Sequence, residues 1–472
     1  MGITAARRSQ LRSAMTSLHE LEVSTRAFRL SNRANRMPAS PIRKLAPLAE
    51  AAKARGTTVY HLNIGQPDIE TPACMLQRLK QLDAKVLEYS PSTGTPEFLR
   101  SLQHYYKRRL GLHLELNQIL ATTGGSEAIL FAFMACANED DDVMVVEPFY
   151  ANYRAFATMA GLNIVPVTSR GRDGFHMPPR PVWEQALTPR SRLVIICNPS
   201  NPTGTVYSRE ELEMIASFCR DHGLFLVSDE VYREFVYDGG TAISALELDD
   251  VDHFAIVVDS LSKRYSACGI RLGSLVTRNA EVYDACLRMA QGRLSPPGLA
   301  QFVAVGVESL GDDYMRGVLD EYQRRRNVLY DGLTAIPGVF LQKPEGAFYC
   351  MAKLPIENAD DFASWLLSEF DDRGETVMVA PASGFYASDH LGKSEVRIAY
   401  VLKEAALRRS VELLRIAIER YKLTLGRLSA GPGRLRVGPT LPGSPIRHHV
   451  LRSSYLAGCA RMHVVPVKRR TS

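Results

Sequence analysis

The residues best suited to chemistry are a lysine that follows two serines and an arginine placed eight positions later. An apolar, β-branched run at residues 255–258 predicts a buried strand, and Ser260, Ser262 and Lys263 come directly after it. Arg271 stands within a Gly-x-Arg-x-Gly pattern. Partial burial disfavours the charged form of a lysine and makes its amine nucleophilic, and serine hydroxyls with an arginine suit a phosphate. The combination predicts pyridoxal phosphate held by Lys263 as a Schiff base.

An isolated lysine is usually a solvated surface charge, so the residues around it decide the interpretation. The spacing Ser-x-Ser-Lys, followed by Gly-x-Arg-x-Gly, resembles the lysine loop of class I/II aminotransferases, which are fold-type I pyridoxal phosphate enzymes. The resemblance covers residues 23–422. The sequences of residues 62–68, 123–127 and 228–232 are similar to the corresponding segments of prokaryotic aspartate-aminotransferase-like members.

Two other predicted strands also end in polar residues. One runs into the double Asn-Pro motif at 198–202, whose prolines fix the backbone so that Asn201 can point inward. The next ends at Asp229, with Tyr232 three residues on. Ligands of open α/β sheets bind at such strand ends, where a carboxylate can keep a pyridine nitrogen protonated. A helix-capping Asp229 is the alternative, but it leaves Asn201 and Lys263 at successive strand ends unexplained.

The resemblance also implies roles for the residues at these two strand ends. The second asparagine of the motif, Asn201, hydrogen-bonds the cofactor's phenolic oxygen in the family and contributes to substrate binding. Tyr232 is placed to donate to the same oxygen. Asp229 would hold the pyridine nitrogen.

A glycine turn in front of an almost wholly apolar helix predicts the phosphate site. The turn contains Gly124 and Gly125, and the helix is expected to begin near Ser126. A helix N-terminus presents free N–H groups and the positive end of a dipole. We therefore expect the backbone N–H groups of Gly125, Ser126 and Glu127 to bind the phosphate. Ser126 as a simple helix cap is the alternative, and both roles can hold together.

Two tyrosines complete the predicted cofactor site. Tyr150 follows a buried strand, where a planar ring suits stacking on a heteroaromatic cofactor, and Phe149 is the competing choice. Tyr89 opens a segment that resembles the family pattern Tyr-x-x-x-x-Gly-x-x-x-Leu-Arg. In the family this tyrosine reaches the phosphate site of the neighbouring subunit. A buried aromatic before a loop is the alternative for Tyr89.

Substrate contacts are predicted at Gly65 and Arg397. Gly65 ends a short strand where backbone can approach a ligand closely, and its segment resembles the one that opens these aminotransferases. Arg397 stands among apolar neighbours in a predicted strand at 395–400, and a buried arginine needs an anionic partner. The resemblance implies that Arg397 clamps the substrate α-carboxylate. A salt bridge within the protein is the alternative.

The composition sets limits on the class of protein. The 472 residues are 46% hydrophobic and 23% charged, as in ordinary globular proteins, and contain no apolar run of about 18 residues. The eight cysteines form no C-x-x-C pair, so no metal site or disulfide framework is predicted, and a reducing cytoplasm fits. The net charge is +6, but residues 423–472 contribute +9, which leaves −3 for the body. Neither membrane nor nucleic-acid binding is expected of that body.

Changes in composition divide the chain. Residues 1–22 are expected to be a disordered extension, with a mitochondrial transit peptide or a misplaced start codon as alternatives. Residues 23–60 are expected to contribute to a small domain, residues 61–310 to form the large cofactor-binding domain, and residues 311–422 to form the small domain. Residues 423–472, rich in Gly, Pro and Arg, are expected to be a disordered basic tail or a frameshifted end.

The expected fold class is α/β. Strands and helices alternate from about 118 to 277, which predicts a mostly parallel central sheet with helices on both faces. The absence of G-x-G-x-x-G and P-loop patterns disfavours a nicotinamide or ATP site. The resemblance implies the fold-type I transferase fold, with a smaller α+β domain built from both chain ends. It also implies a homodimer with active sites at the subunit interface.

The function expected is transfer of an amino group from an L-amino acid, aspartate-like or of broader range, to a 2-oxo acid such as 2-oxoglutarate. Lys263 would act as general base and then acid. The alternatives are β-elimination, C–S lysis or decarboxylation on the same cofactor, and a non-catalytic regulator that senses pyridoxal phosphate. Side-chain specificity is not readable from the sequence.

Overall fold

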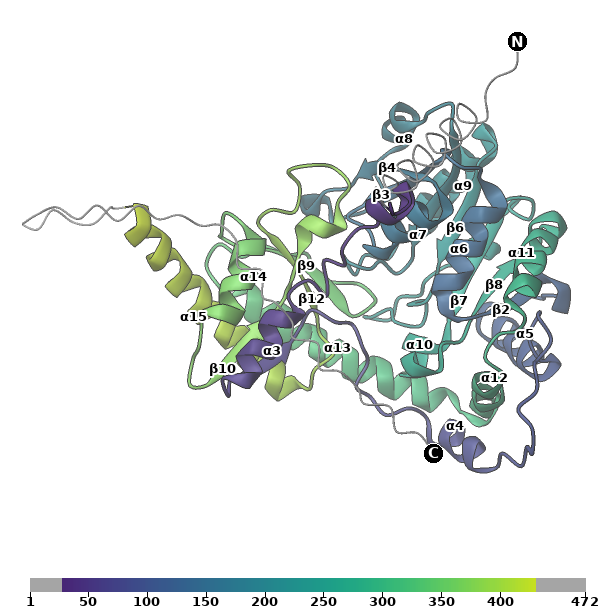
Figure 1. Cartoon of the computed structure of the whole chain (residues 1–472), viewed down its shortest axis with the longest axis horizontal. Helices are drawn as coiled ribbons and strands as arrows, with labels where there is room; N and C mark the ends of the chain where they lie inside the picture. The colour runs from purple at the N-terminus through teal and green to yellow at the C-terminus, as the bar shows by residue number, and fades with distance from the viewer. Residues whose placement is uncertain (1–27, 430–472) are drawn as a thin grey trace, which may run out of the picture. The chain divides into compact units, whose positions relative to one another are not determined.

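A seven-stranded sheet forms the larger part of the computed structural model, which describes residues 28–429 (Figure 1). Its strand order is β2-β8-β7-β6-β5-β3-β4. Most of the strand residues are apolar and buried, because helices cover both faces of the sheet. The strands are β2 (Ile119–Thr122), β3 (Asp142–Glu147), β4 (Asn163–Thr168), β5 (Ser191–Cys197), β6 (Phe225–Asp229), β7 (Ala255–Ser260) and β8 (Gly273–Thr277).

The strand directions bring the polar strand ends to one edge. Strands β4, β3, β5, β6 and β7 are parallel, and β8 is antiparallel to both β7 and β2. In register, Cys197 lies opposite Asp229, and Ser260 lies opposite Gly273. The ends of β2, β3, β5, β6 and β7 and the beginning of β8 therefore meet at the same edge, as the alternation of strands and helices predicted.

Alternate side chains of each strand contact helices on opposite faces. Val257 of β7 belongs to a core cluster with residues of α5, α8 and α9, whereas Val258 faces the start of α6. Helix α6 packs against α7 and α11 on its face. The helices around this sheet are α5 (Pro96–Leu110), α6 (Gly124–Cys136), α7 (Asn152–Ala160), α8 (Arg180–Ala186), α9 (Arg209–His222), α10 (Leu261–Arg264), α11 (Ala280–Arg293) and α12 (Gly298–Ala304).

A smaller α+β part combines both ends of the described chain. Strand β1 (Thr58–His61) pairs in parallel with β10 (Glu375–Met378), and α3 (Ala46–Ala54) packs against α14 (Ala359–Ser368). A second small sheet is antiparallel, in the order β11-β12-β9. Its strands are β9 (Tyr349–Lys353), β11 (Ala380–Pro381) and β12 (Glu395–Ala399).

The remaining helices connect or border these parts. Helix α13 (Asp312–Thr334) runs from the small sheets toward α12 and α4 (Figure 1). Helix α15 (Glu404–Ser429) follows β12 and is the last element of the described residues. The others are α2 (Asn32–Arg36) and α4 (Ala73–Lys80).

Residues 338–341 have the apolar composition that predicts a short strand, but no strand forms there. The chain turns there, with Gly338 at a positive φ of 84°, and only Phe340 makes a β-bridge, to Lys353. The segment is therefore a turn beside β9 rather than a strand.

The predicted domain boundaries fall within one compact unit. The described chain up to Thr424 is one compact unit, so the boundaries expected at 61 and 311 stay predictions. The extension at 1–22 and most of the tail at 423–472 lie outside the described residues. Within residues 28–429, no helix is long and apolar enough to cross a membrane, and no group of three metal-ligating side chains is found.

Candidate active site

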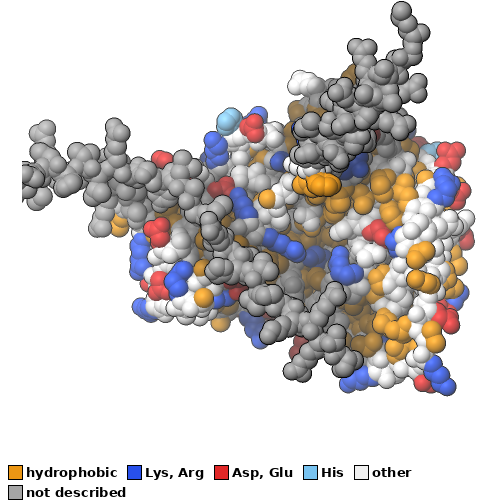
Figure 2. All heavy atoms as spheres, in the orientation of Figure 1, with side chains coloured by type: hydrophobic (Ala, Val, Ile, Leu, Met, Phe, Trp, Pro, Cys, Tyr) orange, Lys and Arg blue, Asp and Glu red, His pale blue; other side chains and the backbone are white. Residues whose placement is uncertain are grey.

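A cavity of about 670 Å³ opens at the sheet edge where the strand ends meet. It is lined by the ends of β5, β6 and β7, the start of α6, strand β12 and the segments around residues 40–43 and 64–65. Twelve of the fourteen predicted site residues line it: Gly65, Gly125, Ser126, Tyr150, Asn201, Asp229, Tyr232, Ser260, Ser262, Lys263, Arg271 and Arg397. On the face drawn in Figure 2, Lys and Arg side chains lie across the middle of the molecule.

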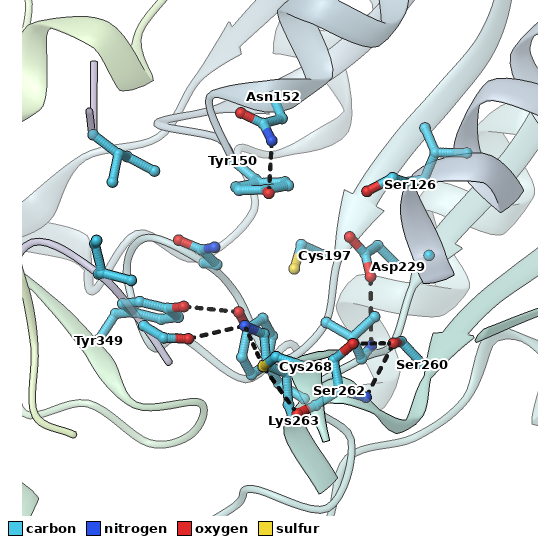
Figure 3. A pocket seen from close by; sticks show the side chains of 18 of the residues that line it. Ser126, Tyr150, Asn152, Cys197, Asp229, Ser260, Ser262, Lys263, Cys268 and Tyr349 are labelled. Carbon is cyan, nitrogen blue, oxygen red and sulfur yellow. Dashed lines mark hydrogen bonds between the residues drawn. The ribbon is translucent and has the colours of Figure 1, made fainter. Parts of the chain in front are cut away.

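Lys263 enters this cavity from the short helix α10, which begins directly after β7. The side chain of Ser260 caps α10 by accepting the backbone N–H of Ser262. Lys263 is half-buried, and its Nζ donates to the backbone carbonyl of Gly65 at 2.9 Å (Figure 3). The Cys268 thiol lies 3.9 Å from the same nitrogen. The amine is thus held inside the cavity by a neutral carbonyl rather than by a carboxylate.

An anion-binding cradle lies beside the lysine. Helix α6 presents its N-terminus with Gly125 and Ser126 in the lining, and the Ser260 and Ser262 hydroxyls lie 2.9 Å apart. Arg271 faces the same site. Its guanidinium donates to the Cys268 carbonyl at 3.0 Å, and no carboxylate pairs with it in the part of the chain that the structure describes.

Glycine is required where the backbone segments of this cradle approach one another. A Cβ on Gly124, whose φ is +72°, would lie 2.7 Å from the Arg271 guanidinium. A Cβ on Gly273 would lie 2.6 Å from the Asp259 carbonyl oxygen and 2.8 Å from the Gly125 nitrogen. Gly273 therefore allows α6, β7 and β8 to approach more closely than a larger side chain would, and the positive φ of Gly124 also favours glycine.

Asp229 is a buried carboxylate at the end of β6. The Tyr153 hydroxyl donates to its Oδ2 at 2.6 Å, and the Val231 backbone N–H donates to its Oδ1 at 3.4 Å. Burial raises the pKa of Asp229 to about 6, and the hydrogen bond from Tyr153 partly opposes that rise. A buried carboxylate of this kind is suited to a cationic or proton-sharing ring nitrogen.

Arg397 provides the cavity with a buried cation that lacks an anion. Its side chain is 1% exposed, donates to the Asn201 Oδ1 at 3.2 Å and to the Asn63 carbonyl, and leaves Nε without a partner. Its guanidinium lies 4.6 Å from the centre of the Tyr349 ring and 4.9 Å from that of Phe385. Burial lowers the pKa of Arg397. No carboxylate among residues 28–429 pairs with it, so the predicted alternative of an internal salt bridge is not found there.

Tyrosines border the rest of the cavity. Tyr150 lies across from Lys263 in Figure 3, and its hydroxyl accepts a hydrogen bond from the Asn152 amide at 2.8 Å. The Tyr232 and Tyr349 hydroxyls lie 2.9 Å apart. Phe149, the competing choice for the stacking ring, is buried and does not line the cavity.

Two predicted site residues do not line the cavity. The Glu127 side chain accepts the backbone N–H of Thr123 at 2.8 Å and pairs with Arg293 at 3.0 Å, although the prediction concerned its backbone N–H. Tyr89 is 81% exposed on the surface. A role for Tyr89 in the site of a second subunit stays a prediction.

Several residues of the site were missed by sequence reasoning. Tyr153 follows Tyr150 by three residues, and the two rings pack edge to face. Tyr349 stands in a predicted strand, but nothing in its sequence context directs it toward Tyr232. Cys268 and Arg43 also line the cavity without any preceding signal.

These groups fit pyridoxal phosphate. The cradle supplies helix N–H groups, two hydroxyls and an unpaired guanidinium for a phosphate, Asp229 suits the pyridine nitrogen, and Lys263 supplies the amine. The unpaired, buried Arg397 suits a substrate carboxylate. An enzyme that acts on amino acids or 2-oxo acids with this cofactor would need these groups.

Comparisons with known proteins agree with this geometry. The family described as aminotransferase class I and II matches residues 57–414. The aspartate aminotransferase of Geobacillus stearothermophilus is 30% identical over 395 residues, which are 82% of this chain and 98% of the relative. The aromatic-amino-acid aminotransferase 2 of Thermococcus litoralis is 30% identical, covering 81% of this chain and 96% of the relative.

A solved structure of Thermus thermophilus aspartate aminotransferase with maleate has a TM-score of 0.76 and is 27% identical. It covers 83% of this chain and is itself covered completely. The chain belongs to the class I and II aminotransferases, a family that depends on pyridoxal phosphate. The predicted family, α/β fold class and transaminase activity are confirmed.

Proposed function

We propose that Lys263 carries pyridoxal phosphate and that the chain transfers an amino group from an L-amino acid, aspartate-like or of broader range, to a 2-oxo acid such as 2-oxoglutarate. The observation that carries the proposal is the convergence of the Lys263 amine, the Asp229 carboxylate and the unpaired Arg397 guanidinium on one cavity. Among the relatives are aspartate aminotransferases, and the Thermus structure contains maleate, a dicarboxylate. These names support a donor such as aspartate.

One group of cavity residues binds the cofactor, and another binds the substrate. The phosphate is bound by the backbone N–H groups of Gly125, Ser126 and Glu127 and by the side chains of Ser260, Ser262 and Arg271. Tyr150 covers the ring, and Asn201 and Tyr232 donate to its phenolic oxygen. Arg397 and Asn201 hold the substrate α-carboxylate close to Gly65, whose carbonyl Lys263 already contacts.

Proton movement is assigned to Lys263. When bound, pyridoxal phosphate acts as an electron sink that makes the Cα proton of the amino acid acidic. The Lys263 amine would take this proton from Cα as general base and then, as general acid, deliver it to the cofactor carbon C4′. Asp229 keeps the ring nitrogen protonated through its buried carboxylate. Arg397 and its Asn201 partner fix the orientation of the Cα–H bond toward Lys263.

The proposed partner is a second copy of this chain. Apolar side chains are exposed on and near α4, directly after α11 and at the start of α12, as expected for a surface that another subunit covers. They are Leu76, Leu79, Val86, Leu87, Leu294 and Leu299. Tyr89, exposed within the same region, would reach the phosphate site of that second subunit. The cytoplasm is the proposed location.

The test combines an absorption spectrum of the cofactor-loaded protein with an assay of aminotransferase activity. Purified protein is saturated with pyridoxal phosphate, and formation of oxaloacetate from aspartate and 2-oxoglutarate is followed. Because Lys263 moves the proton, Lys263→Ala should lower turnover by about a thousandfold or more. It should also lack the absorption band of lysine-bound cofactor. Lys107→Ala, an exposed lysine of α5, is the matched control and should keep both.

Three outcomes would contradict the proposal. An active Lys263→Ala enzyme would show that the lysine is not needed for catalysis. Turnover that needs no 2-oxo acid acceptor would indicate elimination if ammonia is released, or decarboxylation if carbon dioxide is released. Wild-type protein that never acquires the absorption band would exclude the cofactor assignment.

A further inference from the structure

Tyr349 is a buried tyrosine of the cavity lining to which the proposed function gives no role. It is 2% exposed, and its hydroxyl lies 2.9 Å from the Tyr232 hydroxyl (Figure 3). The Arg397 guanidinium lies over its ring, 4.6 Å from the ring centre. Tyr232 is the proposed donor to the cofactor, and Arg397 is the proposed clamp on the substrate. One side chain therefore contacts both groups.

The register of the small antiparallel sheet places Tyr349 beside Arg397. Tyr349 is the first residue of β9 and pairs with Ala399 of β12, two residues after Arg397. Residues two apart on a strand, and residues paired across two strands, share one face of the sheet. Tyr349 and Arg397 are therefore diagonal neighbours on the face that borders the cavity, within the range of a cation–π contact.

Gly65 and Tyr232 hold the ring of Tyr349 from the other side. The Tyr349 hydroxyl packs directly against the Gly65 backbone and leaves no room for a Cβ there. The carbonyl of the same glycine accepts the hydrogen bond from the Lys263 amine at 2.9 Å. The Tyr232 and Tyr349 rings pack edge to face, with their centres 5.6 Å apart. The Tyr349 hydroxyl is thus held in one position between the lysine and Tyr232.

The hydrogen bond between the two tyrosines links Tyr349 to the cofactor. When Tyr232 donates its proton to the phenolic oxygen, its own oxygen can accept a hydrogen bond, and the Tyr349 hydroxyl is the donor at 2.9 Å. Because hydrogen bonds in a chain polarise one another, a hydroxyl that accepts one becomes a better donor. Tyr349 therefore both orients Tyr232 and strengthens its donation to the cofactor.

The surroundings keep Tyr232 a donor. Burial raises the pKa of Tyr232 well above its ordinary value, and the adjacent Tyr349 hydroxyl raises it further. The other titratable and charged groups around the pair are Tyr150 after β3, Cys197 of β5, Asp229 of β6, Lys263 of α10, Tyr322 of α13 and Arg397 of β12. A substitution of Tyr349 alone leaves all of these groups in place.

We propose that Tyr349 is a positioning residue of the aminotransferase site that acts through two neighbours. Its hydroxyl holds Tyr232 on the phenolic oxygen of the cofactor, and its ring holds Arg397 for the substrate α-carboxylate. This inference rests on the proposed function, which assigns those roles to Tyr232 and Arg397. Tyr349 itself moves no proton. Its hydroxyl and its ring therefore have separable effects, the first on the cofactor and the second on the substrate.

The first measurement is the absorption of the cofactor-loaded protein as a function of pH, without substrate. Its midpoint reports the proton on the nitrogen that joins Lys263 to the cofactor, a proton shared with the phenolic oxygen. Donation from Tyr232 to that oxygen loosens the proton. Because Tyr349→Phe weakens the donation, the midpoint should move to higher pH by about half a unit. Tyr60→Phe removes a hydroxyl that donates to Glu375 at 2.7 Å outside the cavity, and should leave the midpoint unchanged.

The second measurement is the KM for aspartate, which separates the ring from the hydroxyl. Tyr349→Phe keeps the ring and should change KM by less than about twofold. Tyr349→Leu removes the ring as well. Since Arg397 then loses its cation–π contact, KM should rise by about fivefold or more.

Two results would overturn the inference while leaving the aminotransferase activity in place. An unchanged midpoint in Tyr349→Phe would show that the hydroxyl does not act on Tyr232. The same KM in Tyr349→Phe and Tyr349→Leu would show that the ring does not hold Arg397. Failure of the proposed function has a separate signature, namely a wild-type protein that never acquires the absorption band of lysine-bound cofactor. Circular dichroism of each variant verifies that it folds.

Discussion

At the scale of single residues, burial controls the protonation of Asp229. Its pKa in the folded chain is raised to about 6 from an ordinary value of 3.8. Between these values the folded chain binds more protons than the unfolded chain, so this residue makes the apoprotein less stable as the pH rises from about 4 to about 6. The contribution is up to about 3 kcal/mol. Asp229→Asn should remove this pH dependence.

The measurement is urea unfolding of apoprotein at several pH values between 4 and 7. The free energy of unfolding of Asp229→Asn, relative to wild type, should increase with pH over this interval. Asp249→Asn changes an exposed carboxyl and serves as the control. If the free energy of unfolding changes with pH in the same way for wild type and Asp229→Asn, Asp229 does not hold its proton in the folded chain over this interval.

The sequence identified residues that sit in motifs and missed those that only the fold brings together. Lys263, Asp229 and Asn201 each follow a recognisable strand and turn, so their convergence could be predicted from strand direction alone. Arg43 reaches the cavity from a turn near the start of the chain, where the Asn63 amide donates to the neighbouring Ile42 carbonyl. No local pattern reports such contacts, because they depend on how distant segments pack.

At the scale of elements, apolar runs predicted the central strands and most helices. Strand β8 follows β7 but runs antiparallel to it, a direction that a buried apolar run cannot reveal. Residues 338–341 had the composition of a strand and formed a turn because no strand pairs with them over more than one residue. Pairing partners, rather than local propensity, decided these two segments.

Close packing of β7, β8 and α6 leads to a prediction for Gly273→Ala. The added methyl group would lie 2.6 Å from the Asp259 carbonyl and 2.8 Å from the Gly125 nitrogen. Since the backbone must shift, we expect the free energy of unfolding to fall by about 1–3 kcal/mol. The affinity for pyridoxal phosphate should also fall, because the start of α6 is displaced. Thermal unfolding and cofactor titration measure the two effects.

Gly292 of α11 provides the matched control. A Cβ at this position has no atom within 4 Å, and its φ is not positive. Gly292→Ala should therefore leave cofactor affinity unchanged and raise helix stability by up to about 1 kcal/mol. Equal effects of the two substitutions would contradict the role assigned to the contact at Gly273.

At the scale of the whole molecule, the predicted α+β part from both chain ends is present. Strand β1 pairs with β10 more than 300 residues later in the chain, and α3 packs against α14. The sequence indicated that part through its resemblance to the family, not through periodicity. The proposed role of Tyr89 cannot be seen in a single chain, because it requires a second subunit.

Mixing two variants tests that role directly. Tyr89→Ala is expected to lose activity because the phosphate site of its partner lacks a donor, and Lys263→Ala is inactive through loss of the amine. In a mixed dimer, one site combines Lys263 of the first variant with Tyr89 of the second and is intact. Random reassociation of equal amounts should therefore restore about a quarter of wild-type activity, since half of the dimers are mixed and each has one good site. Because Tyr89 is exposed and lies outside its own cavity, rescue is the result expected. Absence of rescue, in dimers shown by light scattering to have exchanged subunits, would mean that Tyr89 acts within its own chain or not at all.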